Sequence, residues 1–130
     1  MTRPIIFRAK AVSSGQWVYG NLIHSKRFAG WSNEWRIHNQ DTGLESDVLP
    51  ETVGQFTGLL DQNGKQIFEG DIVTMVSYNH PHLSGRKYSV VYSSDDFCYV
   101  LCSLEGKYYI IIGFHSLEVV TNIHDNPYLI

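Results

Sequence analysis

The chain has 130 residues and a formal net charge of −3 at pH 7, and 43% of its residues are hydrophobic. This length and composition fit one domain or two small lobes with a packed interior, and they exclude an intrinsically disordered chain. No apolar run approaches the roughly 20 residues that a membrane-spanning helix needs, so we expect a cytoplasmic protein that does not contact membranes.

The first third of the chain predicts one clear β-hairpin. Residues 5–9 and 16–24 combine apolar and β-forming side chains, and residues 13–15 between them have the composition of a turn. The following segment, residues 25–47, has the weakest pattern of the whole chain. Within it we expect a short strand at residues 34–38.

The centre of the sequence is dense in turn residues. Asn63-Gly64 lies between two partly apolar runs. This predicts a hairpin with a type I′ turn, because both central residues of that turn need positive φ. Gly54, Gly58 and Gly70 are expected to occupy tight turns, since glycine adopts positive φ without a steric penalty.

The remaining elements predict a mainly β fold with little helix. Pro50 favours a single helical turn at residues 50–52, because proline suits the first helical position. From residue 70 onward turns recur about every ten residues, the spacing expected of a small barrel or sandwich. The strands expected in this part are residues 72–76, 86–92, 97–104, 108–112 and 117–120.

Two acids flank a glycine at the start of a predicted strand, Glu69 before Gly70 and Asp71 after it. Two carboxylates in this position could form an acid pair or hold a hard metal ion. Acids around a glycine turn more often accept turn hydrogen bonds, and this is the interpretation that we favour.

His80 and His82 are the second candidate for metal binding. Pro81 separates them, and zinc sites use three or four protein ligands, so two loop histidines are too few. Asp95-Asp96 follows two serines, which is typical of a solvated turn rather than of paired catalytic carboxylates. The chain also lacks the common nucleotide-binding, hydrolase and metalloprotease motifs. We therefore predict no catalytic residue, no metal site and no cofactor.

The segment from Thr52 to Val73 resembles the central signature of the YopX family of phage and prophage proteins. The residues that form this signature are Gly54, Gly58, Asn63, Gly64, Glu69, Gly70 and Asp71. Shorter pieces match in the right order at Phe7-Arg8-Ala9, Val18-Tyr19-Gly20 and residues 122–127. The chain departs from the family pattern at Lys10, Thr121 and His124.

The resemblance implies a fold and an origin but no established activity. It implies an N-terminal β lobe over residues 1–58 packed on a C-terminal SH3-like small β-barrel over residues 59–130, and the two parts could form one compact unit. It also implies a phage or prophage protein of unknown biochemical role. No catalytic residue can be transferred from the family to this chain.

Positive charge is concentrated near the start of the chain. Residues 1–36 contain six Lys or Arg and one Glu, and they include Trp31 and Trp35. Cations beside aromatic side chains suit single-stranded nucleic acid, although the alternative is a solvated face with inward-packed tryptophans. The candidate partner-binding residues are Arg27, Trp31, Trp35 and Arg36.

Three functions remain open at this point. The first is a non-enzymatic binding or assembly module that forms a homo-oligomer or binds another protein, because small β folds expose strand edges and aromatic area. The second is a nucleic-acid-binding accessory protein that uses the basic N-terminal segment. The third is an enzyme without a recognisable motif, which nothing in the sequence favours.

Overall fold

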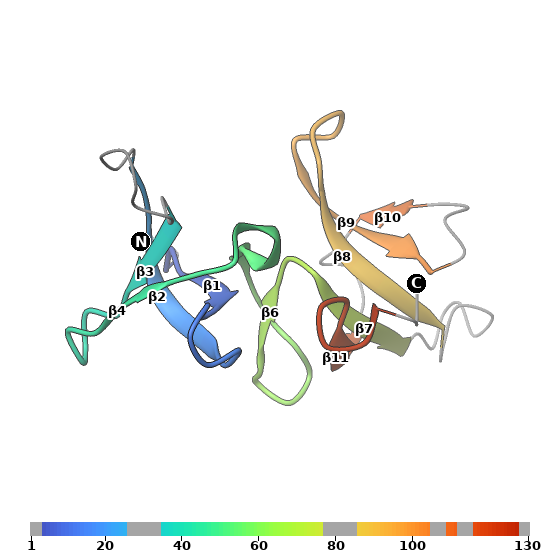
Figure 1. Cartoon of the computed structure of the whole chain (residues 1–130). Helices are drawn as coiled ribbons and strands as arrows, with labels where there is room; N and C mark the ends of the chain where they lie inside the picture. Colours follow the sequence, from blue (N-terminus) through green and yellow to red (C-terminus); the bar gives the residue numbers. More distant parts are fainter. Residues whose placement is uncertain (1–3, 26–34, 77–85, 105–108, 112–115, 128–130) are drawn as a thin grey trace. The chain divides into compact units, whose positions relative to one another are not determined.

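The computed structural model describes residues 4–25, 35–76, 86–104, 109–111 and 116–127 (Figure 1). Strands dominate these residues, and their helical content is one 3-10 turn, η1 (Pro50–Thr52). The predicted mainly β fold and the helical turn are therefore confirmed. The strands are β1 (Phe7–Lys10), β2 (Trp17–His24), β3 (Trp35–His38), β4 (Glu45–Asp47), β5 (Gly54–Leu60), β6 (Gln66–Phe68), β7 (Asp71–Val76), β8 (Lys87–Ser93), β9 (Cys98–Ser103), β10 (Tyr109–Ile111) and β11 (Ser116–Asn122).

The strands form two antiparallel sheets. The first sheet has the order β4-β3-β2-β1-β5-β6, and the second has the order β10-β9-β8-β7-β11. The chain divides into two compact units, Met1–Phe56 (unit 1) and Thr57–Ile130 (unit 2), each described by itself below. The division falls within β5, whose first residues pair with β1 in unit 1.

Unit 1 is built on the predicted hairpin of β1 and β2. Ala9 pairs with Val18, and Arg8 pairs with Tyr19. Because side chains alternate along a strand, the first pair faces the core of the unit and the second pair faces away from it. The core consists of buried Ala9, Ile37 and Val48, with half-buried Phe7, Val18, Leu22, Trp35 and Val53 packed against them.

The sheet of unit 1 continues through β3 and β4. The sequence predicted β3 but not β4, whose residues Glu45, Ser46 and Asp47 are polar and have low β propensity. Pairing with β3 holds β4 in place, since Ile37 lies opposite Ser46. Gly20 permits β2 to approach the end of β3, because a Cβ at that position would lie 2.2 Å from the His38 carbonyl oxygen.

The predicted hairpin at Asn63-Gly64 is present, but its turn is not type I′. Gly64 has φ of 82°, whereas Asn63 is not among the described residues with positive φ. Gly64 N–H donates to Asp61 O at 3.0 Å, and Asp61 N–H donates to Lys65 O at 2.7 Å. This pattern is a type I turn followed by a left-handed glycine, the G1-bulge form of a hairpin. The predicted turn type is therefore wrong, although its location is right.

Two of the three other signature glycines adopt the expected conformation. Gly58 has φ of 91° and Gly70 has φ of 92°. Gly54 instead lies in β5 opposite Arg8, so its predicted place in a tight turn is wrong. The reason is that β1 extends the sheet at this position and draws Gly54 into the strand pair.

Unit 2 contains a four-strand meander, β7 to β10, to which β11 returns by pairing with β7. Its core comprises Ile67, Val73, Met75, Tyr88, Val90, Leu101 and Leu117. Within the described residues no pairing joins the edge strands β10 and β11. The sheet is therefore open, and the structure does not contain the closed barrel that the resemblance implied.

Candidate functional site

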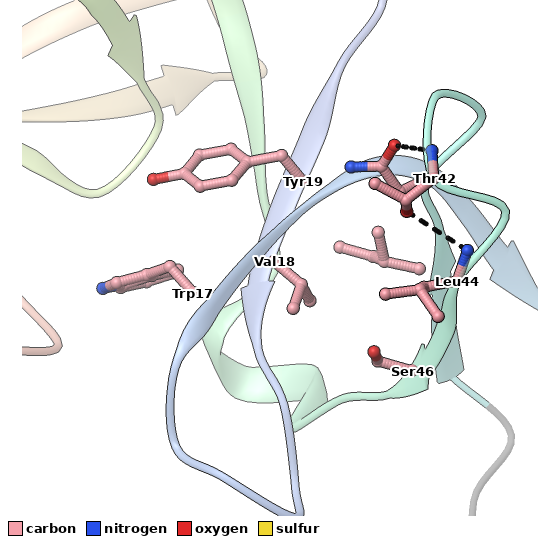
Figure 2. A pocket seen from close by; sticks show the side chains of 8 residues that line it. Trp17, Val18, Tyr19, Thr42, Leu44 and Ser46 are labelled. Atoms are coloured by element: carbon pink, nitrogen blue, oxygen red, sulfur yellow. Dashed lines mark hydrogen bonds between the residues drawn. The ribbon is translucent and has the colours of Figure 1, made fainter.

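A hollow in unit 1 is the first candidate site. It lies beside β2, β3, β4 and the β3–β4 connection and has a volume of about 210 Å³. Figure 2 shows Val18, Leu44 and Ser46 on the side of β2 where the hollow opens, whereas Trp17 and Tyr19 point to the other side of that strand. The remaining lining residues are Ile37, Asn39 and Thr42.

Side-chain hydrogen bonds fix the polar rim of the hollow. Asn39 Oδ1 accepts the N–H groups of Asp41 and Thr42 at 2.9 Å and 3.1 Å. Thr42 Oγ1 accepts the N–H of Leu44 at 3.2 Å, and both Thr42 bonds are drawn in Figure 2. The side chain of Leu44 remains 69% exposed. The β3–β4 connection is thus held in one conformation while it presents apolar surface to solvent.

The size and lining of the hollow restrict what it can bind. Small-molecule sites usually span about 300–1,000 Å³ and place several polar groups around a ligand. This hollow is smaller, and its lining combines the apolar Val18, Ile37 and Leu44 with the polar Asn39, Thr42 and Ser46. It suits a single apolar or aromatic side chain of a partner better than a substrate.

The other face of the β1–β2 pair carries a cluster of cations and aromatic rings, here called the cation–aromatic face (Arg8, Lys10, Trp17 and Tyr19). The Trp17 ring centroid lies 4.5 Å from Arg8 Cζ and 5.5 Å from Lys10 Nζ. Both distances fall within the roughly 6 Å over which cation–π attraction acts. The cluster therefore fixes Trp17 between two positive charges.

The members of the cation–aromatic face differ in exposure. Arg8 is only 6% exposed and its guanidinium lies over the Trp17 ring, whereas Tyr19 is 42% exposed. Trp17 and Lys10 are half-buried. Tyr19 is therefore the most exposed member of the face. The sequence analysis missed this face, but alternation along residues 8–10 and 17–19 would have placed all four side chains on one side of the hairpin.

Of the predicted partner-binding residues, Trp35 and Arg36 lie in the described part of the chain. Trp35 packs against the core of unit 1 and stacks on His24, with ring centroids 3.7 Å apart and planes 6° apart. Arg36 pairs with Glu45, and its Nη2 donates to Ser25 Oγ at 3.3 Å. Because Trp35 and Arg36 are adjacent in β3, they point to opposite faces. Arg27 and Trp31 lie outside the described residues.

The candidate acids show no metal-binding cluster in the described part of the chain. Asp71 is 1% exposed, and its Oδ2 accepts the Phe68 N–H at 2.8 Å, which is the predicted type of turn hydrogen bond. Glu69 is half-buried. No three His, Cys, Asp or Glu side chains gather in a metal-binding cluster among these residues. His80 and His82 are outside them.

Comparison with protein families identifies the relatives of this chain. A family model described as YopX protein matches residues 6–130, which is nearly the whole sequence. The chain belongs to the YopX family. No curated protein matches it.

The YopX signature of this chain serves its fold in the described structure. Gly58, Gly64 and Gly70 adopt positive φ, and Asp71 caps the turn before β7. None of them lines the hollow or belongs to the cation–aromatic face. Among the described residues no helix is long and apolar enough to cross a membrane.

Proposed function

We propose that this YopX-family chain is a non-enzymatic binding and assembly module of phage or prophage origin that forms a homo-oligomer in the cytoplasm without a cofactor. The hollow of unit 1 carries this proposal. Apolar Val18 and Ile37 in its lining, beside the exposed Leu44, suit contact with a side chain of a protein partner.

The fold of unit 2 is part of the same proposal. Strands β7 to β10 form a meander, and β11 pairs with β7. This strand order supports an SH3-like arrangement even though the described sheet is open. Such small β units act in many proteins as binding modules, and this is an analogy of fold alone.

Size-exclusion chromatography with light scattering tests the proposed assembly. We expect the purified chain to elute at a multiple of its 14.8 kDa mass, with an unchanged mass after nuclease treatment. A mass of one chain across the micromolar concentration range would contradict assembly.

Nucleic-acid binding is a second candidate, and the geometry of Trp17 favours it. The half-buried Trp17 ring and the exposed Tyr19 ring lie on one face with Lys10, and aromatic rings beside cations provide stacking and phosphate contacts for single strands. The same chromatography would then show an absorbance ratio at 260 and 280 nm that falls after nuclease treatment. Lys10→Glu should reduce this co-purification, whereas Lys65→Glu in unit 2 should not.

A further inference from the structure

Phe97 in unit 2 combines high exposure with an unusual backbone conformation. Its side chain is 83% exposed, and its φ of 55° makes it the one non-glycine residue with positive φ in the described part of the chain. A bulky residue is rare in the left-handed region, and at this exposure no core packing compensates for the strain. Strained residues of this kind cluster at functional sites, so Phe97 is a candidate contact residue.

The turn between β8 and β9 holds Phe97 at the end of a long hairpin. β8 pairs with β7 only as far as Ser89, whereas its pairing with β9 continues to Ser93 opposite Cys98. The hairpin therefore extends beyond β7, as Figure 1 shows. Ser93 Oγ donates to Asp96 Oδ2 at 3.0 Å and accepts the Asp96 N–H at 3.2 Å, which fixes the turn.

A pair of tyrosines lies beside this turn. Tyr92 and Tyr99 are cross-strand partners whose rings meet edge to face, with centroids 5.4 Å apart and planes at 75°. Tyr92 is also 51% exposed. We refer to Tyr92, Phe97 and Tyr99 as the aromatic tip. Aromatic side chains are frequent anchors of protein interfaces, and those on a paired hairpin lose little freedom on binding.

The charge around the aromatic tip is negative. Asp95 and Asp96 directly precede Phe97, both are exposed, and residues 88–104 contain no Lys or Arg. Two tips would therefore repel each other, because like charges brought together oppose association. The same charges disfavour contact with the phosphates of nucleic acid. The surface that complements this tip carries both aromatic rings and cations.

The cation–aromatic face of unit 1 has these properties. Arg8 Cζ and Lys10 Nζ lie 4.5 Å and 5.5 Å from the Trp17 ring centroid, and Tyr19 is 42% exposed. Aromatic rings attract one another in edge-to-face and offset arrangements beyond the effect of the area that they bury. On this face the ring of Phe97 would exchange contact with water for contact with the Tyr19 and Trp17 rings.

The spacing of rings and charges agrees on the two surfaces. On the face, Lys10 lies opposite Trp17 and diagonal to Tyr19, and diagonal neighbours of an antiparallel pair are about 7–8 Å apart. In the tip, Asp95 and Phe97 are two residues apart, so their Cα atoms are separated by at most about 7 Å. A ring of the tip can therefore meet Tyr19 while the acid beside it meets Lys10.

We infer that the aromatic tip of one molecule docks on the cation–aromatic face of another, with Phe97 against Tyr19 and Asp95 beside Lys10. This inference rests on the proposed assembly function and specifies its partner, a second copy of the chain, at a surface other than the hollow. Burial of the rings supplies the attraction and the charges select the surface, since electrostatic complementarity gives specificity more than affinity. The contact joins two different surfaces, so it repeats from molecule to molecule and gives a closed ring or an open chain.

Exchange of one charge pair tests this contact. Asp95→Lys and Lys10→Glu each bring like charges together, so each variant alone should associate at least about tenfold more weakly than the wild type. Asp95 is changed rather than Asp96, whose hydrogen bonds with Ser93 fix the turn. An equimolar mixture of the two variants should recover the wild-type oligomer mass, and so should the double variant, because opposite charges then meet again. Light scattering of nuclease-treated protein over a range of concentrations measures these masses.

Phe97→Asn tests the ring itself, because asparagine suits positive φ and lacks the apolar surface. It should weaken association about tenfold or more, as loss of an interface anchor does. Matched controls are Lys87→Glu and Asp41→Lys, which make the same charge changes at exposed positions outside both surfaces. Both controls should assemble like the wild type, and circular dichroism with thermal unfolding should show every variant folded.

The outcomes separate this contact from assembly in general. A wild-type monomer would refute assembly itself and this contact with it. An oligomer that persists in the single variants, or charge variants that do not recover when mixed or combined, would overturn docking of the tip on the face while leaving assembly intact. An oligomer that nuclease treatment disperses would overturn it as well, because nucleic acid would then join the molecules.

Discussion

Asp61 fixes the signature hairpin of unit 2 through a single carboxylate. Its Oδ1 accepts the N–H groups of Asn63 and Lys65 at 2.8 Å and 2.9 Å, and its Oδ2 accepts the Val119 N–H at 3.0 Å. Burial alone would raise the pKa of this carboxyl, but the three N–H groups and the charge of Lys65 outweigh burial and lower the pKa. The carboxylate thus connects the turn to β11.

Acid should remove the contribution of Asp61 to stability. Because its folded pKa is lowered, this contribution is complete above the unfolded pKa of about 3.9 and is lost as the pH falls through the folded pKa. Asp61→Asn should lower the free energy of unfolding at pH 7 by roughly 1–3 kcal/mol, since an amide cannot accept all three bonds.

Urea unfolding at several pH values measures this effect. The difference between wild type and Asp61→Asn should shrink as the pH falls below about 4, since the wild-type carboxylate itself becomes protonated there. Asp41→Asn at an exposed position is the control and should have little effect at any pH. A difference that stays constant into strong acid would show that the charge of Asp61 is not what stabilises the turn.

At the scale of elements, the form of the β5–β6 hairpin distinguishes its two central residues. In a type I′ turn Asn63 and Gly64 would both need positive φ, whereas in the observed G1-bulge form only Gly64 does. Gly64→Ala should therefore cost about 1–2 kcal/mol of unfolding free energy, because φ of 82° strains an L-residue while no atom lies within 4 Å of the added Cβ.

Asn63→Ala serves as the comparison, with an expected cost within about 0.5 kcal/mol. Thermal or urea unfolding of both variants gives the two values. Equal and large costs at the two positions would favour the type I′ turn over the observed one.

The elements differ in how far sequence could predict them. The strands of unit 2 were predicted because β-branched residues and turns alternate regularly there. The Asn-Gly pair located a hairpin, but Asp61 and its distant partner Val119 select the turn form, and no local pattern shows that bond. β4 was missed because its polar residues become a strand only by pairing with β3.

At the scale of the whole molecule, the candidate surfaces depend on sheet register rather than on neighbouring residues. The hollow combines side chains from residues 17 to 46, and the cation–aromatic face joins two strands. The excess of Lys and Arg in residues 1–36 indicated the part of the chain that contains the cation–aromatic face. It did not indicate that Arg36 pairs with Glu45 or that Trp35 stacks on His24. Both contacts depend on how β3 pairs with its neighbouring strands, and amino-acid composition does not specify that pairing.

The dependence on salt concentration distinguishes the two functions proposed for the whole chain, assembly and nucleic-acid binding. Apolar contact between copies of the chain depends on burial, so raising NaCl from about 50 to about 500 mM should leave the oligomer mass unchanged or slightly increase assembly. Phosphate contacts respond in the opposite way, because counterion release makes nucleic-acid affinity fall linearly on a double logarithmic scale with salt. Co-purified nucleic acid should therefore dissociate over the same range. Light scattering and the absorbance ratio at 260 and 280 nm, both recorded at the two salt concentrations, measure the two effects separately. An oligomer that dissociates at high salt would show that attraction between opposite charges, and not apolar burial, holds the molecules together.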